Sequence, residues 1–156
     1  MSKTSEEKMV ASGGQQQHPP EGSVHFINIA DVPEVHLSTR TVAHDQGWSR
    51  SLVKKPLNGS PDLLMAAVRM EPHHHHPRHS HPNMGEIYFI HQGRCRLEVG
   101  GEARWVTAGT AIYVPRGTPH CVDTGDEGVT FLVIFPEGDP QKIGKEFFDP
   151  DAQARF

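Results

Sequence analysis

Short apolar runs separated by turn residues constrain the fold of this chain more than any other feature. The runs are four to nine residues long, and glycine- or proline-containing segments such as "NGSP", "GGE", "PRGTP" and "TGDEG" separate them. They cover residues 24–29, 36–42, 62–70, 86–92, 94–99, 103–106, 110–114, 119–122 and 129–136. No convincing helical period occurs before residue 140. This pattern predicts an all-β sandwich or barrel.

The composition divides the chain into a barrel with two flanking segments. Residues 1–22 are polar and are predicted to be a disordered tail. Residues 23–140 hold the apolar runs and are predicted to form the barrel, and 156 residues in all suffice for one buried core. Residues 141–156 form a C-terminal extension, which is predicted to be either a short helix or an extended strap over one sheet.

Alternation along the runs predicts which side chains face the core. In residues 94–99, Cys95 and its apolar neighbours fall on one face and charged residues on the other, as in a half-buried strand. Residues 86–90 are apolar on both faces, which predicts a strand between two packed layers. A carboxylate such as Glu86 is costly to bury there unless it is paired or bound to a cation. Cys95 and Cys121 are not spaced as a metal or redox motif, and both are predicted to be free thiols.

The segment "HHHHPRHSHPNMGE", residues 73–86, is rich in histidine, and the chain has twelve histidines in all. His79 and His81 lie two residues apart, so on an extended chain both imidazoles point to the same side. Glu86 begins the next run, and His120 begins a later one. Three imidazoles with one carboxylate suit a divalent transition metal, namely Fe, Mn, Ni, Co, Cu or Zn. The run His73–His76 lacks a carboxylate at matching distance, and we expect an exposed loop at the barrel rim.

These residues resemble the two motifs of the cupin superfamily. The first motif reads Gly-x5-His-x-His-x3/4-Glu-x6-Gly, and here His79, His81, Glu86 and Gly93 match it. The second reads Gly-x5-Pro-x-Gly-x2-His-x3-Asn, and its matches here are Gly109, Pro115, Gly117 and His120. The sequence departs from the motifs at two turn positions. His73 stands where the leading glycine is expected, and Thr124 stands where the trailing asparagine is expected.

The resemblance implies a fold and a metal site. The fold would be a small double-stranded β-helix, the cupin jelly-roll barrel, with one metal ion inside its mouth. His79, His81, Glu86 and His120 would be the ligands, with Fe or Mn the favoured metal, and one or two coordination positions would stay open for water, O2 or substrate. Cupins usually pair through their outer sheets, so the resemblance also implies a homodimer.

Three further side chains are candidates for the site. Tyr88 follows Glu86 by two residues and shares its face, so it is either a catalytic acid or base beside the metal or a packed aromatic. Tyr113 is a weaker candidate for substrate binding. Arg69 precedes the histidine segment, where it would either hold a substrate carboxylate or lie on the surface. The histidines of residues 73–76 would at most shuttle protons or attract an anionic substrate.

Three functions fit a cupin of this kind. The first, which we favour from the sequence, is a metal-dependent dioxygenase that acts on a small substrate and in which Glu86 accepts a proton. The second is a redox-neutral lyase, decarboxylase, isomerase or cyclase. The strings "EIY" and "IFP" resemble small cupins that cleave dimethylsulfoniopropionate, which would make Tyr88 the base. The third is a non-catalytic cupin that binds a ligand or a metal.

Charge and hydropathy set the expected partners and location. The formal charge is −4 with acidic and basic residues interspersed, which argues against a nucleic-acid or anionic-membrane partner. No apolar run approaches the roughly 18 residues of a membrane span, and the N-terminal residues lack the apolar stretch of a signal peptide. We therefore expect a cytoplasmic protein that binds a small-molecule substrate.

Overall fold

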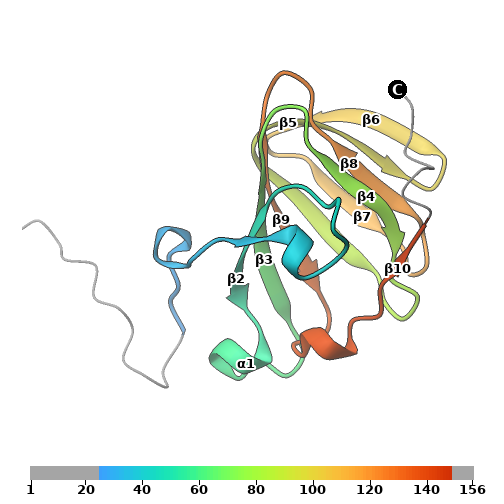
Figure 1. Cartoon of the computed structure of the whole chain (residues 1–156). Helices are drawn as coiled ribbons and strands as arrows, with labels where there is room; N and C mark the ends of the chain where they lie inside the picture. The colour runs from blue at the N-terminus through green and yellow to red at the C-terminus, as the bar shows by residue number, and fades with distance from the viewer. Residues whose placement is uncertain (1–24, 149–156) are drawn as a thin grey trace, which may run out of the picture.

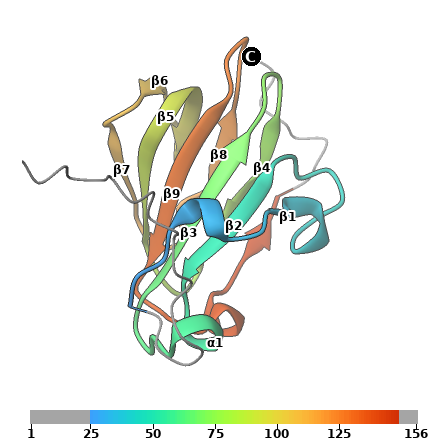
Figure 2. The same cartoon turned by 90° about the vertical axis from the view of Figure 1, so that its left-hand side faces the viewer.

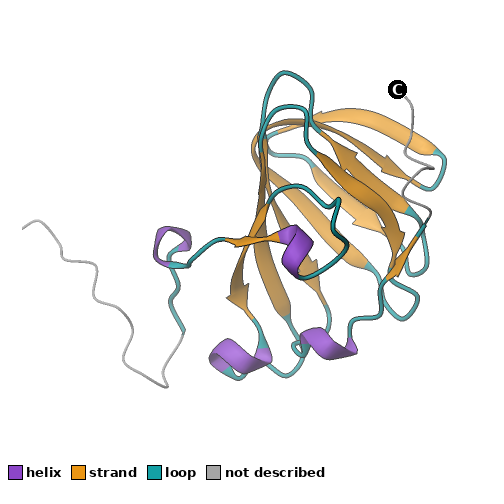
Figure 3. Ribbon diagram, in the orientation of Figure 1, coloured by secondary structure: helices purple, strands orange, loops and turns teal. Residues whose placement is uncertain are grey.

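The computed structural model describes residues 25–148, and these residues fold into a curled, almost entirely antiparallel β structure (Figure 1, Figure 3). The strands are β1 (Val35–His36), β2 (Trp48–Val53), β3 (Leu64–Met70), β4 (His75–Ser80), β5 (Glu86–Val99), β6 (Glu102–Thr107), β7 (Ala111–Val114), β8 (His120–Asp123), β9 (Val129–Phe135) and β10 (Glu146–Phe147). The helical segments are short, namely η1 (Ile29–Asp31), η2 (Leu37–Thr39), α1 (Lys55–Asn58) and η3 (Pro140–Lys142).

Two sheets are joined through one long strand. The order of hydrogen-bonded strands is β1-β2-β3-β9-β5-β8-β4-β10, and β6 and β7 also pair with β5. The first half of β5 pairs with β7 and β9, and its second half pairs with β6 and β8. The sheets therefore curl around a common interior, and the view turned by 90° shows the same curl (Figure 2).

Gly93 lets β5 pass from one sheet to the other. Its φ is +81°, a left-handed conformation that residues with a Cβ rarely adopt. A Cβ on this residue would lie 2.1 Å from the carbonyl oxygen of Gly128. The trailing glycine of the first motif is thus required by backbone geometry and by close approach of the next turn.

The interior is filled from both sheets. Its main cluster contains Met70, Tyr88, Ile90, Cys95, Leu97, Val122 and Phe131 with their neighbours. Cys95 packs in this core as predicted, and Cys95 and Cys121 are both buried free thiols. Burial of these apolar side chains is the main source of stability for the barrel.

Several sequence predictions need correction. His75 and His76, expected in an exposed loop, belong to strand β4, which spans residues 75–80. This strand pairs with β8 despite Pro77, because the register shifts between His76 and His79. Strand β2 was not predicted, since the segment 48–53 lacks clear alternation of apolar residues. The two runs of residues 86–99 form one strand rather than two.

The first runs of the chain and the faces of residues 86–90 also differ from expectation. Residues 25–28 and 40–42 form no strand, and residues 29–31 and 37–39 are 3-10 helices. In β5 the side chains of Glu86, Tyr88 and Ile90 are buried, whereas Ile87 and Phe89 are exposed. Within residues 25–148, this part of β5 is therefore covered on only one of its two faces.

The C-terminal extension is extended where the structure describes it. Strand β10 pairs with β4, with Glu146 opposite Ser80 and Phe147 opposite His79. Of the two expected forms, a short helix or an extended strap, residues 146 and 147 adopt the extended one. The predicted disordered tail, residues 1–22, and residues 149–156 lie outside the described residues. Within residues 25–148, no helix is long and apolar enough to cross a membrane.

Candidate metal centre

Three histidines and one glutamate meet inside the barrel. His79, His81, Glu86 and His120 each offer one ligand atom, and these atoms all lie within 4.8 Å of one another. All four residues are buried. They come from the inner face of β4, the turn that follows it, the first residue of β5 and the first residue of β8. The structure therefore brings together the four residues that the sequence proposed as ligands.

Backbone carbonyl groups orient the three imidazoles. The Nδ1 of His79 lies 2.8 Å from the carbonyl oxygen of Pro77, and the Nδ1 of His81 lies 2.7 Å from that of Gly144. The Nδ1 of His120 lies 2.9 Å from the carbonyl oxygen of Thr118. Because a carbonyl oxygen only accepts hydrogen bonds, each Nδ1 carries the hydrogen and each Nε2 keeps a lone pair. This is the tautomer that a metal ligand requires.

The strand pairing explains why these rings converge. His79 lies directly opposite His120 in the pairing of β4 with β8. The register shift before His79 absorbs one extra residue, so that His76 and His79 both face the interior, opposite Val122 and His120. Antiparallel partners project to the same face of a sheet, which brings the ligands from two strands together.

The carboxylate of Glu86 lies within this group of lone pairs. Its Oε1 is 2.5 Å from the Nε2 of His120 and 3.3 Å from the Nε2 of His81. All three atoms are buried, and none makes a hydrogen bond with the described residues. Buried polar atoms without hydrogen bonds are costly. A cation between them would remove this cost, so the residues present fit a bound metal ion.

The protonation states also fit metal binding. Burial raises the pKa of Glu86, but the adjacent His120 and His81 lower it to a net value of about 2, so the carboxylate is ionised at neutral pH. Burial lowers the pKa of His79 well below 6.5, and the basic side chains around it lower it further. A neutral imidazole and an ionised carboxylate are the states in which these groups bind metals.

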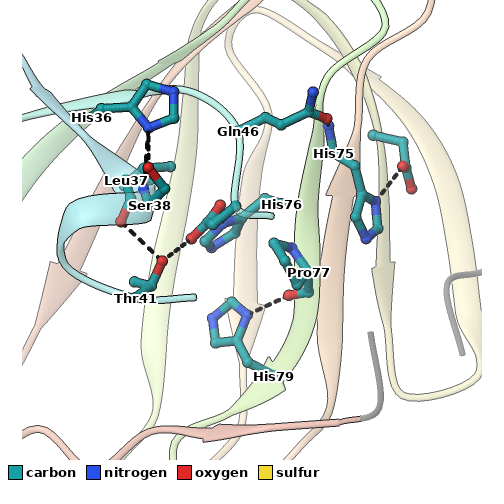
Figure 4. Close-up of polar contacts among 11 residues, drawn as sticks. His36, Leu37, Ser38, Thr41, Gln46, His75, His76, Pro77 and His79 are labelled. Carbon is teal, nitrogen blue, oxygen red and sulfur yellow. Dashed lines mark hydrogen bonds and ion pairs between the residues drawn. The ribbon is translucent and has the colours of Figure 1, made fainter. Parts of the chain in front are cut away.

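A second polar pair lies next to the quartet, and sequence reasoning missed it. The Nδ1 of His76 is 2.6 Å from the Oδ1 of Asp45, whose other oxygen accepts a hydrogen bond of 2.5 Å from Thr41 (Figure 4). Burial raises the pKa of Asp45, but His76 and Thr41 lower it more. Burial lowers the pKa of His76, and Asp45 only partly opposes this. Because Asp45 and His76 are 31 residues apart and Asp45 lies in no motif, the sequence held no signal for this pair.

The other histidines of the segment 73–76 lie away from the quartet. The Nδ1 of His75 is 2.6 Å from Asp123, with which it pairs across β4 and β8, whereas His76 faces the interior. His73 is exposed, and its φ of +60° keeps the left-handed turn for which the motif uses glycine. Thr124, at the other departure from the motifs, donates a hydrogen bond to the carbonyl of Glu71 and accepts one from His74. Both departures therefore preserve an ordered turn.

Of the remaining candidates, Tyr88 is close to the quartet. Its ring packs against His120 at 5.8 Å and against Phe131 at 5.1 Å between centroids, within the core. Burial, together with the charge of Glu86, raises the pKa of Tyr88 well above 10. A role as base would therefore depend on a bound cation to lower that pKa.

Arg69 and Tyr113 do not reach the quartet. The guanidinium of Arg69 donates two hydrogen bonds, of 2.8 and 3.0 Å, to the carboxylate of Glu34 and stacks over Trp48 at 4.3 Å. Because the residues on either side of Arg69 in β3 are buried in the core, strand alternation turns its side chain to the outer face. Tyr113 is opposite the exposed Ile87 and is itself exposed. Both side chains thus lie on the outer face, away from the quartet, and for Arg69 this is the surface alternative left open by the sequence.

Comparison with known proteins agrees with the two motifs and with the fold. The family model described as "Cupin domain" matches residues 66–135, a range that includes both motifs. Residues 66–135 therefore form a cupin domain. Among solved structures, a cupin-like protein from Thermotoga maritima is 22% identical with a TM-score of 0.56, covering 66% of this chain and 76% of that chain, and it supports the fold alone.

Two solved enzymes are also similar to this cupin. The polyketide cyclase RemF from Streptomyces resistomycificus is 25% identical with a TM-score of 0.67, and the match covers 81% of this chain and 87% of that chain. Oxalate decarboxylase from Bacillus subtilis, which has Mn(II) centres, is 28% identical with a TM-score of 0.57. That match covers 65% of this chain and 28% of the decarboxylase.

Curated proteins match over shorter stretches. An uncharacterised protein from Streptomyces coelicolor is 38% identical over 50 residues, or 32% of this chain and 48% of that protein. A glucose-6-phosphate isomerase from Pyrococcus abyssi is 39% identical over 64 residues, or 37% of this chain and 34% of the isomerase. The matches thus span about a third to a half of the length of these relatives.

Proposed function

We propose that this cupin is a metal-dependent enzyme that carries out redox-neutral chemistry on a small oxygen-bearing organic substrate. The observation that carries the proposal is the buried quartet, in which three oriented Nε2 lone pairs and one ionised carboxylate converge. Support for redox-neutral chemistry comes from the similar enzymes, which are a cyclase, a decarboxylase and an isomerase. The match to the cyclase covers most of both chains.

The residues of the site would have three distinct roles. His79, His81, Glu86 and His120 would hold the ion, which when bound would act as a Lewis acid toward a substrate carbonyl or carboxylate. Glu86 stays ionised in the buried site, so it keeps the site's formal charge low when a divalent cation binds. The surrounding apolar side chains exclude water and strengthen each electrostatic interaction with the substrate.

A dioxygenase is the second candidate. The set of three histidines and one carboxylate favours it, because such a set suits a redox-active metal and leaves coordination positions open. Fe or Mn would be the metal in this case, whereas Zn, Co, Ni or Cu would also serve redox-neutral chemistry. A cupin that binds a ligand without turnover is the third candidate, and it shares the same quartet.

Dependence on O2 separates the candidates. Protein stripped with a chelator and reloaded with Fe, Mn, Ni, Co, Cu or Zn would be incubated with hydroxy acids, β-keto acids and polyhydroxylated aromatics, with and without O2. We expect turnover of at least one substrate that persists under strict exclusion of O2. Turnover that requires O2 and consumes it would replace the redox-neutral function with the dioxygenase. Tight metal binding with no turnover in either atmosphere would favour the non-catalytic cupin.

A further inference from the structure

The pair of His76 and Asp45 lies beside the quartet but provides none of its ligands. Only 8% of the His76 side chain is exposed, and the Asp45 side chain is fully buried. Asp45 belongs to the loop between η2 and β2, so the pair joins this loop to β4. A buried histidine and carboxylate lose their hydration when the chain folds, and their retention needs an explanation.

The ring of His76 borders the interior that the quartet occupies. In β4 it lies opposite the buried Val122, just as His79 lies opposite His120. Its ring meets that of His79 edge to face, with centroids 4.7 Å apart and planes at 70°. Figure 4 shows the two rings next to each other, His76 toward Thr41 and His79 held at Pro77.

The chemistry of Asp45 decides which nitrogen of His76 carries the hydrogen. One carboxylate oxygen accepts from Thr41 at 2.5 Å, and the other lies 2.6 Å from the Nδ1 of His76. An ionised carboxylate only accepts hydrogen bonds, so Nδ1 of His76 carries the hydrogen. The Nε2 of the neutral ring then holds a lone pair, since the hydrogen bond of the His76 ring within residues 25–148 is made at Nδ1.

The loop does not depend on this pair for its attachment to β4. The backbone N–H of Gln46 donates to the carbonyl of His75 at 3.1 Å, and the side-chain oxygen of Gln46 accepts from the N–H of His75 at 2.9 Å. These hydrogen bonds join the loop to the strand at the adjacent residue. A purely structural link would thus not require a second, buried pair of polar side chains.

We propose that the Nε2 of His76 accepts a hydrogen bond from a hydroxyl group of the substrate and orients that substrate at the metal centre. This inference rests on the proposed function, because it places the substrate at the quartet. The substrate class is a compound that carries a hydroxyl or enol next to an oxygen that binds the metal. Asp45 acts as a positioning residue, since it fixes the ring and its tautomer without touching the substrate.

The test uses two small metal-binding probes on the Zn(II)-loaded full chain. Catechol bound through one phenolate keeps a hydroxyl that can donate to His76, whereas guaiacol, its monomethyl ether, does not. We expect His76→Phe to weaken catechol binding by about three- to tenfold, the usual effect of one lost hydrogen bond, and to leave guaiacol binding unchanged. The matched control is His75→Phe, because His75 pairs with Asp123 at the same distance of 2.6 Å on the adjacent position.

A measurement on the unmodified protein keeps the inference testable if His76→Phe does not fold. In the ¹⁵N spectrum, His76 should show a protonated Nδ1 and an unprotonated Nε2, and catechol but not guaiacol should shift the Nε2 signal. A protonated Nε2 would overturn the inference while leaving the metal site intact. Equal losses of affinity for catechol and guaiacol in His76→Phe would do the same. Failure of the unmodified protein to bind Zn(II) would instead refute the proposed function.

Discussion

The Nε2 of His120 lies 2.5 Å from the Oε1 of Glu86, and both atoms are buried. The Nδ1 of His120 carries its hydrogen, since it donates to the carbonyl of Thr118, so a lone pair of Nε2 faces a negative carboxylate. Such a contact is unfavourable unless a cation or a proton lies between the atoms. The contact is therefore the most direct structural sign of a metal centre in this barrel.

The positive φ of His73 predicts a stabilising substitution. His73 is the one non-glycine residue with positive φ within residues 25–148, at +60°, and it stands where the motif has glycine. The left-handed conformation costs a residue with a Cβ about 1–2 kcal/mol, which exceeds the entropy cost of glycine. We expect His73→Gly to raise the free energy of unfolding by about 0.5–1 kcal/mol in urea denaturation. His74→Gly, at an adjacent position without positive φ, should lower the free energy of unfolding. A lower free energy of unfolding in His73→Gly would contradict the strain argument.

Gly93 and Gly117 make a matched pair for testing the crossing of β5. Both have positive φ, but a Cβ on Gly93 would meet the carbonyl of Gly128 at 2.1 Å, whereas nothing lies within 4 Å of a Cβ on Gly117. We expect Gly93→Ala to cost about 3 kcal/mol of unfolding free energy, and Gly117→Ala about 1 kcal/mol. Urea midpoints at unchanged slope measure both changes. Equal losses would show that the close approach is not required.

The lowered pKa of His79 predicts acid sensitivity of the metal-free protein. Burial keeps the folded-state pKa well below 6.5, so below pH 6.5 the unfolded chain binds a proton that the folded chain does not. The stability contributed by neutral His79 is therefore full above pH 6.5 and falls as the pH decreases, by up to about 1.4 kcal/mol per pH unit. In chelator-treated protein, His79→Asn should reduce this slope. If the free energy of unfolding falls equally with pH in the unmodified protein and in His79→Asn, His79 is not the source of the acid sensitivity.

The exposed apolar residues on the outer face of β5 and β7 support the homodimer that we expected, which stays a prediction. Ile87 is 44% exposed, Phe89 37% and Tyr113 69%, and Ile87 lies directly opposite Tyr113. Contiguous apolar residues on a surface often mark an interface. We expect a dimer in analytical ultracentrifugation, and Ile87→Lys should dissociate it. Leu57→Lys, at an exposed apolar position on α1, should not; a monomeric unmodified protein would contradict the prediction.

The sequence was sufficient for the fold class and for naming the four proposed ligands, because both depend on the spacing of residues within short segments and within two motifs. Strand alternation alone placed the two histidines that lie two residues apart on one side of the chain, next to the glutamate that begins the following strand. The double motif added the distant His120, and the structure brings all four together. The turn at His73 also survives without its glycine.

The sequence failed where long-range pairing overrides local pattern. The segment 75–80 contains Pro77 and polar histidines, which indicated a loop, but a register shift lets it pair with β8 as a strand. The neighbour of His76 is Asp45, which only the folded chain brings within reach. For Arg69 and Tyr113 the sequence did not show which strand face is outward, whereas the burial and pairing of β3 and β7 place both side chains on the outer face.

Metal content tests the central claim most directly. The full chain, purified without a metal-affinity column, and its single variants would be dialysed against a divalent metal and measured by mass spectrometry. We predict about one equivalent for the unmodified protein and for His75→Ala, and a loss of at least about tenfold in affinity for His79→Ala, His81→Ala and His120→Ala. His75 is the matched control, because it is a histidine of the same strand with its own carboxylate partner. Retention of the metal in all three quartet variants, or its loss in His75→Ala alone, would contradict the account.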